Sequence, residues 1–340
     1  MVTIYDIAKE VGCAPSTVSR ALGGAYGVHE KTKQKIFQVA KMLNYVPDST
    51  AKNLKTKRTW NIGVVMYIEG LSGLKHYLFA EILDSFANVV ESFNYDVTLF
   101  SKNIVLSEKS LLAHCRSKRL DGVFIVCGDF TAKPIKELLE SEIPVVTVDY
   151  FNADSDTINC VTSDNRRKMY DLTEYILQNG HRDILYIMGQ DVFVTQERVK
   201  GFQAALKAYG VPFRSEMLRR GEYYNLDLTY RLTQEAMSGE KRPTALLMPD
   251  DYCAIAAYDA LAAMGLRIPS DVSVAGFDGL EIGQRMMPSL TTIRQNTVGI
   301  GEYAANRLLA LIEGTADETG SLKTIEGQLI CGESVGKIAN

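Results

Sequence analysis

From Asn61 onward, short apolar runs rich in β-branched residues alternate with stretches of helical periodicity. The predicted strands cover Ile62 to Met66, Val97 to Phe100, Gly122 to Val126, Val145 to Val148, Ile184 to Met188, Ala245 to Met248 and Ser273 to Gly276, and the first predicted helices cover residues 78 to 93, 107 to 117 and 133 to 140. Apolar strands separated by helices predict parallel sheets with helices on both faces. Because roughly 280 residues are too many for one such sheet, we expect two lobes that face a cleft.

The composition is that of an ordinary soluble globular chain, with 46% apolar and 23% charged residues in 340. No window approaches the roughly 18 uninterrupted apolar residues of a membrane helix, and the N-terminus lacks the apolar core of a signal peptide. We therefore expect a cytoplasmic protein without a membrane segment. The six cysteines are scattered, with no CxxC pair and no matching histidine cluster, so the sequence predicts buried thiols and no metal site.

The net charge of −4 is unevenly distributed. Residues 1 to 60 hold ten Lys or Arg against four acids, a balance of +6, and the remaining residues therefore carry −10. A basic N-terminal segment followed by an acidic remainder indicates a small domain that binds a polyanion. The larger domain attached to it is not expected to bind one.

The basic segment begins with a predicted bundle of short amphipathic helices. These helices cover Ile4 to Val11, Pro15 to Leu22 and Lys31 to Leu43. Gly12 lies in the break between the first two, as the tight turn of a helix-turn-helix requires. Away from its apolar stripe, the second helix carries Ser16, Thr17, Ser19 and Arg20. Short hydroxyls and one guanidinium suit phosphate and base-edge contacts in a major groove. A small helical protein-binding domain is the alternative, and the positive charge favours DNA.

A polar segment follows the third helix. Pro47 stops that helix, and Asp48 or Ser49 is suited to cap a new helix of about two turns. Leu54 stands between Asn53 and Lys55, the arrangement that a minor-groove wedge needs. The alternative is an ordinary linker whose one leucine packs on the next domain.

Several motifs together resemble the lactose-repressor/galactose-repressor family of bacterial transcription regulators. They are Thr3-Ile4-Tyr5-Asp6-Ile7-Ala8-Lys9, Ser16-Thr17-Val18-Ser19-Arg20-Ala21-Leu22, Asn44-Tyr45-Val46-Pro47 and Ala51-Lys52-Asn53-Leu54. The resemblance implies a helix-turn-helix that reads the major groove and a hinge helix that inserts Leu54 into the minor groove. The DNA-binding residues that we expect are Thr3, Pro15, Ser16, Thr17, Ser19, Arg20, Tyr45, Ala51, Asn53, Leu54 and Lys55.

The resemblance also implies a domain organisation. It predicts a small all-α helix-turn-helix headpiece at 1–46, a hinge helix and linker at 47–60, and a core at 61–340 that is similar to a periplasmic sugar-binding protein. The N-lobe is expected at about 61–162 and 292–326, and the C-lobe at about 163–291 and 327–340. The three crossings between lobes are then placed near residues 162–165, 291–294 and 326–329.

Ligands bind such sheets beyond the carboxyl ends of the strands. The residues found there are Asp149, Asp250, Asp251 and Asp278, with Arg198 on the helix that follows Met188. Carboxylates and a guanidinium bind hydroxyl groups well, and the rings of Phe79, Tyr223 and Tyr224 are suited to stack on a sugar face. Capping of a helix N-terminus is the alternative for each aspartate. With the resemblance, the expected effector-binding residues are Phe79, Asp149, Arg198, Tyr223, Asp250 and Asp278, and the ligand is a neutral sugar with no cofactor.

Catalytic motifs are missing from the sequence: there is no Walker A loop, nucleophile elbow or HExxH. The cleft carboxylates resemble a glycosidase pair, so a sugar-processing enzyme is one alternative, and a transport-type sugar-binding protein is another. An enzyme has no use for a basic helix-turn-helix, and a transport-type protein needs export, which the lack of a signal-peptide core disfavours. The sequence therefore favours a non-enzymatic repressor.

The resemblance predicts a homodimer on a pseudo-palindromic operator, because twofold protein symmetry matches twofold DNA symmetry. The segment Gly332 to Asn340 contains no apolar heptad. A C-terminal zipper needs three or four heptads, so assembly is expected to stop at the dimer.

Overall fold

The computed structural model describes residues 2–23, 27–45, 58–68, 71–72, 74, 76–100, 110–152, 158–317 and 320–338. The chain forms two compact units, Met1–Thr59 and Trp60–Asn340, and each is described by itself. Within these residues, no helix is both long and apolar enough to cross a membrane.

The first unit contains the three predicted helices. They are α1 (Ile4–Val11), α2 (Pro15–Leu22) and α3 (Glu30–Met42). The helix α1 ends at Gly12, whose φ of 77° lies in the left-handed region that glycine adopts without steric cost. Pro15 occupies the first turn of α2, where a missing N–H costs nothing. One side of each helix is apolar, and together these sides bury Ile7, Ala8, Val18, Ala21, Ile36, Val39 and Ala40.

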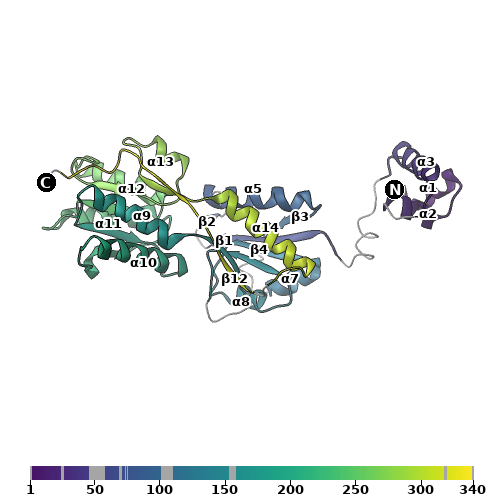
Figure 1. Cartoon of the computed structure of the whole chain (residues 1–340), viewed down its shortest axis with the longest axis horizontal. Helices are drawn as coiled ribbons and strands as arrows, with labels where there is room; N and C mark the ends of the chain where they lie inside the picture. Colours follow the sequence, from purple (N-terminus) through teal and green to yellow (C-terminus); the bar gives the residue numbers. More distant parts are fainter. Residues whose placement is uncertain are drawn as a thin grey trace. The chain divides into compact units, whose positions relative to one another are not determined.

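The N-lobe of the second unit is built on the larger of its sheets (Figure 1). Its strands are β1 (Asn61–Ile68), β2 (Leu71–Ser72), β3 (Asp96–Leu99), β4 (Gly122–Cys127), β5 (Val145–Val148), β6 (Asn159–Ser163) and β12 (Ser321–Ile325), in the order β12-β6-β5-β4-β1-β2 with β3 also on β1. All pairs are parallel except β1 with β2. The helices α5 (Tyr77–Ser92) and α14 (Thr297–Glu313) cover one face, and α7 (Leu111–Lys118) and α8 (Lys133–Leu139) cover the other.

The C-lobe repeats this arrangement on a smaller scale. Its sheet has the order β10-β9-β7-β8, with β7 at Ile184–Met188, β8 at Leu218–Arg220, β9 at Ala245–Leu247 and β10 at Ser273–Ala275. The helices α9 (Asn165–Gln178) and α10 (Phe193–Ala208) bury one face, and α11 (Leu226–Ser238) and α12 (Asp251–Ala263) bury the other. Two parallel sheets with helices on both faces confirm the predicted fold class.

The chain passes between the lobes near 163–165, 294–297 and 325–328, where N-lobe strands and helices give way to C-lobe elements. From the sequence, the second N-lobe segment was predicted to begin at about residue 292. Instead, β11 (Thr292–Arg294) pairs antiparallel with β13 (Gln328–Ile330) and bridges to the C-lobe residues Ala275 and Asp278. These backbone bonds hold β11 to the C-lobe, so the N-lobe resumes only after Arg294.

Candidate functional site

The helix α2 presents one polar face. Val18 and Ala21 are buried in the headpiece core, whereas Ser16, Ser19 and Arg20 are exposed and Pro15 and Thr17 are half-buried. The four side chains that the sequence assigned to DNA on α2, together with Pro15, therefore share the side of the helix that is free of core contacts. An exposed helix face with two serine hydroxyls and a guanidinium at its end fits a major groove.

Two of the other predicted DNA-binding residues have structural contacts. The backbone N and Oγ1 of Thr3 both donate to Oδ2 of Asp6 at 2.8 Å, and these bonds lower the pKa of that carboxyl. Tyr45 packs against the headpiece core, and its backbone N donates to the Ala40 carbonyl at 2.9 Å. Thr3 is thus the N-cap of α1, and Tyr45 packs at the end of the bundle after α3. The remaining predicted residues, Ala51, Asn53, Leu54 and Lys55, lie outside the described residues.

In the core, Asp149 follows β5 directly, as predicted. Its φ of 59° turns the chain sharply, and its Oδ1 accepts a hydrogen bond from Oγ1 of Thr162 at 2.5 Å. Burial raises the pKa of the Asp149 carboxyl. The Nδ2 of Asn165 donates to the same Thr162 oxygen at 2.9 Å, so the carboxylate connects to the first crossing.

Arg198 of α10 is 3% exposed, and its donors are directed at fixed acceptors. Its Nε donates to Oδ1 of Asn165 at 2.8 Å, and its Nη1 donates to the Pro249 carbonyl at 2.8 Å. The guanidinium carbon lies 3.6 Å from the centre of the Phe277 ring, which holds the group flat by a cation–π contact. Asp149 and Arg198 are thus joined through Thr162 and Asn165 across the lobe junction.

Asp250 is the N-cap of α12. Its Oδ1 accepts from the backbone N of Cys253 at 2.8 Å, and its Oδ2 accepts from the backbone N of Tyr224 at 2.9 Å. Burial raises the pKa of this carboxyl, and the two backbone bonds oppose that change. Both oxygens therefore hold backbone in place, which is the capping role that the sequence left open.

Asp251 anchors two segments to the start of α12. Its Oδ1 accepts from Oγ1 of Thr292 at 2.6 Å, and its Oδ2 accepts from the backbone N of Leu280 at 2.7 Å. The side chain is completely buried, and that burial raises the pKa of the carboxyl from 3.8 to about 7. Asp251 therefore holds both β11 and the turn before α13 (Glu281–Arg285) against the N-terminus of α12.

The raised pKa of Asp251 predicts a pH-dependent stability. The folded protein holds this proton more tightly than the unfolded chain, so the free energy of unfolding should fall by up to a few kcal/mol as the pH rises from about 4 to about 7. Asp251→Asn cannot ionise, so its stability should depend less on pH. Its amide N–H group would point toward one of the two donors, Leu280 or Thr292, so the variant should be less stable than the parent at pH 4 by about 1 to 3 kcal/mol. Urea unfolding across this range measures both. If the free energy of unfolding changed with pH in the same way for the parent and for Asp251→Asn, the raised pKa of Asp251 would be contradicted.

Asp278 lies beyond β10 in a backbone conformation that L-residues rarely adopt, with a φ of 123°. Its Oδ1 accepts from Nε2 of Gln295 at 2.7 Å, and Oε1 of Gln295 accepts from Oγ of Ser163 at 2.5 Å. Its Oδ2 is buried and has no hydrogen-bond partner among the described residues. Burial holds the pKa of this carboxyl well above its ordinary value. One carboxyl oxygen of Asp278 is thus hydrogen-bonded to Gln295 in the second crossing, and the other has no partner among the described residues.

The predicted aromatic residues come from both lobes. Phe79 of α5 is buried, and the hydroxyl of Tyr223 lies 2.8 Å from Oγ1 of Thr195. The Tyr223 ring covers Gly189 so closely that a Cβ on this glycine would lie 2.1 Å from a ring carbon. Glycine is therefore required at the end of β7 to admit the ring.

Sequence reasoning missed several polar residues at the lobe junction. These are His76, Thr162, Asn165 and Gln295. Asn165 and Gln295 belong to the first two crossings and Thr162 lies at the end of β6 beside the first, where polar side chains next to apolar strands were a usable signal. Nothing in the sequence distinguished His76 from an ordinary residue before a helix.

Comparison with known proteins agrees with this geometry. Residues 3–48 match the bacterial regulatory proteins of the lacI family, and residues 173–335 match the periplasmic binding protein-like domain. The probable HTH-type transcriptional repressor ExuR of Bacillus subtilis (strain 168) is 31% identical over 96% of this chain and 96% of the relative. The HTH-type transcriptional repressor PurR of Photorhabdus laumondii subsp. laumondii is 32% identical over 95% of this chain and 94% of its own length.

Solved structures show the same fold. The lac repressor dimer bound to operator and the anti-inducer ONPF matches with a TM-score of 0.82 and 24% identity, over 98% of this chain and 99% of that one. The complex of the transcriptional regulator CelR with cellobiose matches with a TM-score of 0.74 and 24% identity, over 98% and 100%.

A helix-turn-helix unit and a two-lobed core like that of periplasmic binding proteins define a DNA-binding transcriptional regulator. The chain belongs to the lacI family of bacterial regulatory proteins. The resemblance found in the sequence motifs is therefore confirmed, and the headpiece is the part that recognises DNA.

Proposed function

We propose that this regulator is a repressor controlled by a small, neutral, sugar-like effector that binds where the two lobes meet, without a cofactor. The observation that carries the proposal is the buried Oδ2 of Asp278, which has no hydrogen-bond partner among the described residues, and the charge of Arg198 lowers the pKa of this same carboxyl against the effect of burial. A buried carboxyl oxygen needs a hydrogen-bond partner, and a hydroxyl group is the neutral group that fits, because it donates to a carboxylate and accepts from a protonated carboxyl. The CelR structure, by its description, holds cellobiose.

The same geometry argues against glycoside hydrolysis. A glycosidase needs two carboxyl groups that are free to act as acid and as nucleophile or base. Here Asp250 holds two backbone N–H groups, and Asp251 holds a backbone N–H group and a threonine hydroxyl. Asp149 accepts from Thr162, and Asp278 accepts from Gln295, so Asp278 alone of these four has a buried oxygen without a partner among the described residues. We therefore propose that the carboxylates are structural or ligand-binding and that the protein is not an enzyme.

A thermal-shift screen against neutral mono- and disaccharides, their uronic acids and their phosphate esters tests the effector class. At least one neutral sugar should raise the melting temperature, because a ligand that binds only the folded state stabilises it. Stabilisation by the acids or phosphate esters alone would overturn the neutral-sugar proposal. Release of a free sugar from any glycoside would overturn the non-enzymatic one.

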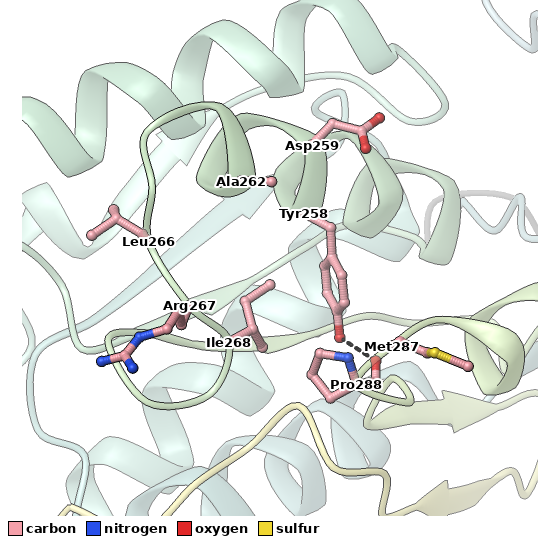
Figure 2. A pocket seen from close by; sticks show the side chains of 8 residues that line it. All are labelled: Tyr258, Asp259, Ala262, Leu266, Arg267, Ile268, Met287 and Pro288. Atoms are coloured by element: carbon pink, nitrogen blue, oxygen red, sulfur yellow. Dashed lines mark hydrogen bonds between the residues drawn. The ribbon is translucent and has the colours of Figure 1, made fainter.

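The C-lobe carries a groove beside the turn that contains Met287 and Pro288 (Figure 2). A groove of about 390 Å³ is lined by Tyr258, Asp259, Ala262, Leu266, Arg267, Ile268, Met287 and Pro288. Met287 is 93% exposed, and the Tyr258 hydroxyl fixes the adjacent turn by donating to the Pro288 carbonyl at 3.0 Å. The groove combines apolar side chains with Asp259 and Arg267, so an exposed methionine beside it gives each copy both a projection and a recess, as an isologous dimer requires. We propose a homodimer through this face, which would place two headpieces on a pseudo-palindromic operator.

Met287→Glu should weaken this dimer by about a hundredfold, because each copy would bury a charge in the partner's groove. Sedimentation velocity at micromolar concentration should then show mainly monomer, against dimer for the parent. Phe213→Glu is the control, since Phe213 is also exposed in the C-lobe but does not line the groove. A dimer of unchanged strength in Met287→Glu would place the interface elsewhere.

A further inference from the structure

His76 directly precedes α5 and is 4% exposed. Both ring nitrogens are buried and have no hydrogen-bond partner among the described residues. Burial lowers the pKa of the imidazole to about 4, so the ring is neutral near pH 7 and carries one N–H donor and one acceptor. Buried polar atoms are almost always paired in folded proteins, so two unused atoms on one side chain need an explanation.

The rings around His76 come from both lobes. Its ring centre lies 4.7 Å from that of Phe79 in the N-lobe, 4.1 Å from that of Tyr224 and 5.6 Å from that of Tyr252, both in the C-lobe. His76 is therefore a point at which the lobes touch. A phenylalanine would fill this space equally well and would bury no unpaired nitrogen, so packing alone does not account for a histidine here.

The second unused group belongs to Asp278 in the C-lobe. Leu280, two residues after Asp278, belongs to the apolar cluster against which Tyr224 and Tyr252 pack, and the charge of Asp278 adds to the effect of burial in raising the pKa of both tyrosine hydroxyls. Its Oδ2 is the buried atom without a partner. Each lobe thus contributes one unsatisfied polar side chain to the surroundings of Tyr224 and Tyr252.

We propose that His76 is a specificity-determining contact for the effector, and that hydroxyl groups of one ligand satisfy His76 of the N-lobe and Oδ2 of Asp278 of the C-lobe together. This inference rests on the proposed function of the lobe junction. A hydroxyl donates to a carboxylate oxygen and either donates to or accepts from an imidazole nitrogen. The surrounding rings supply flat apolar faces for the C–H side of a sugar ring. The ligand class is therefore a cyclic polyol with hydroxyl groups on opposite edges.

This arrangement couples ligand to lobe contact. When His76 packs on the two tyrosines without ligand, its nitrogens and the Asp278 oxygen lose their hydrogen bonds to water and form none to protein in return, which costs free energy. A ligand that bonds to both lobes removes this cost only when the lobes meet. It therefore binds one arrangement of the lobes better than the others, which is the differential affinity that allosteric control requires.

The test is His76→Phe, which keeps a ring of similar size and removes both nitrogens. His114→Phe is the matched control, because His114 lies in the same lobe on α7, against Phe100 and away from the tyrosines. Calorimetry uses D-glucose, D-galactose, cellobiose, D-glucuronate and adenosine as probes. Parent and His114→Phe should bind one neutral sugar equally, and His76→Phe should bind it about tenfold or more weakly. His76→Gln, which keeps a donor and an acceptor, should recover part of the loss.

Unliganded His76→Phe should melt at the parental temperature or above it, which separates a lost contact from a folding defect. Equal affinity of parent and His76→Phe for the bound probe would overturn the inference while leaving the proposed effector class intact. If glucuronate or adenosine is the probe that binds and His76→Phe loses it, the role of His76 stands and the neutral-sugar effector is wrong. Failure of the parent to bind any probe would count against both.

Discussion

Replacing Arg20 with alanine is expected to abolish most of the preference of this protein for its operator. Arg20 is exposed in the last turn of α2, on the side of the helix that is free of core contacts. A guanidinium bound to a base edge contributes about 1 to 3 kcal/mol of discrimination, and a dimer uses it in each half-site, so about 2 to 6 kcal/mol should be lost. Fluorescence anisotropy with operator and with shuffled duplex measures the ratio.

The control for this prediction is Lys55→Ala. It removes a lysine that we expect to contact a DNA phosphate. It should weaken binding to operator and to shuffled DNA alike, and it should lower the magnitude of the slope of log affinity against log salt by about 1.8, because the dimer loses one phosphate contact in each half-site. Arg20→Ala should leave the affinity for shuffled DNA within a factor of a few. If Arg20→Ala keeps the full operator preference, α2 is not the helix that reads bases.

The second large effect is expected at Arg198. Arg198→Met keeps an apolar stem over Phe277 but removes the charge and every donor. The loss of a charged hydrogen bond to a ligand hydroxyl costs about 1.5 to 3 kcal/mol, so effector affinity should fall ten- to hundredfold. Operator affinity without effector should remain near the parental value, because the headpiece is a separate unit.

Arg214→Met is the matched control for Arg198, because Arg214 is an exposed C-lobe arginine that pairs with Asp183 at 2.8 Å. It should respond to effector like the parent. Calorimetry gives the affinities, and the melting temperature without effector shows that both variants fold. Parental effector affinity in Arg198→Met would show that the guanidinium only braces Asn165 and Pro249.

Much of the fold was predictable because the strands of the parallel sheets are continuous apolar runs. The predicted strand Gly122 to Val126 became β4 (Gly122–Cys127), and α1 and α2 have the predicted bounds. The strand β8 (Leu218–Arg220) was not predicted, because it is a short edge strand with exposed arginines. The strands β11 and β13 were also missed, since three residues in a crossing carry no periodicity.

The candidate site was predictable only in part. An aspartate after a strand is expected both for ligand binding and for helix capping, so the sequence could not separate Asp250, which caps α12, from Asp278, which keeps one oxygen unused. His76 and Gln295 acquire their roles only where one lobe meets the other or the chain crosses between them. No local pattern reports such contacts, because His76 meets Tyr224 and Gln295 meets Ser163, partners that lie more than a hundred residues away in the sequence.

The central claim is that the protein recognises a particular DNA sequence as a symmetric dimer. It is tested most directly by selecting duplexes from a random library with the full chain, and then measuring affinity for the selected duplex and for the same duplex with one half-site scrambled. The account predicts an enriched inverted repeat, bound at least about a thousandfold more tightly than random DNA at physiological salt and much more weakly when one half-site is scrambled. Enrichment of no sequence, or equal affinity for selected and random duplexes, would contradict it.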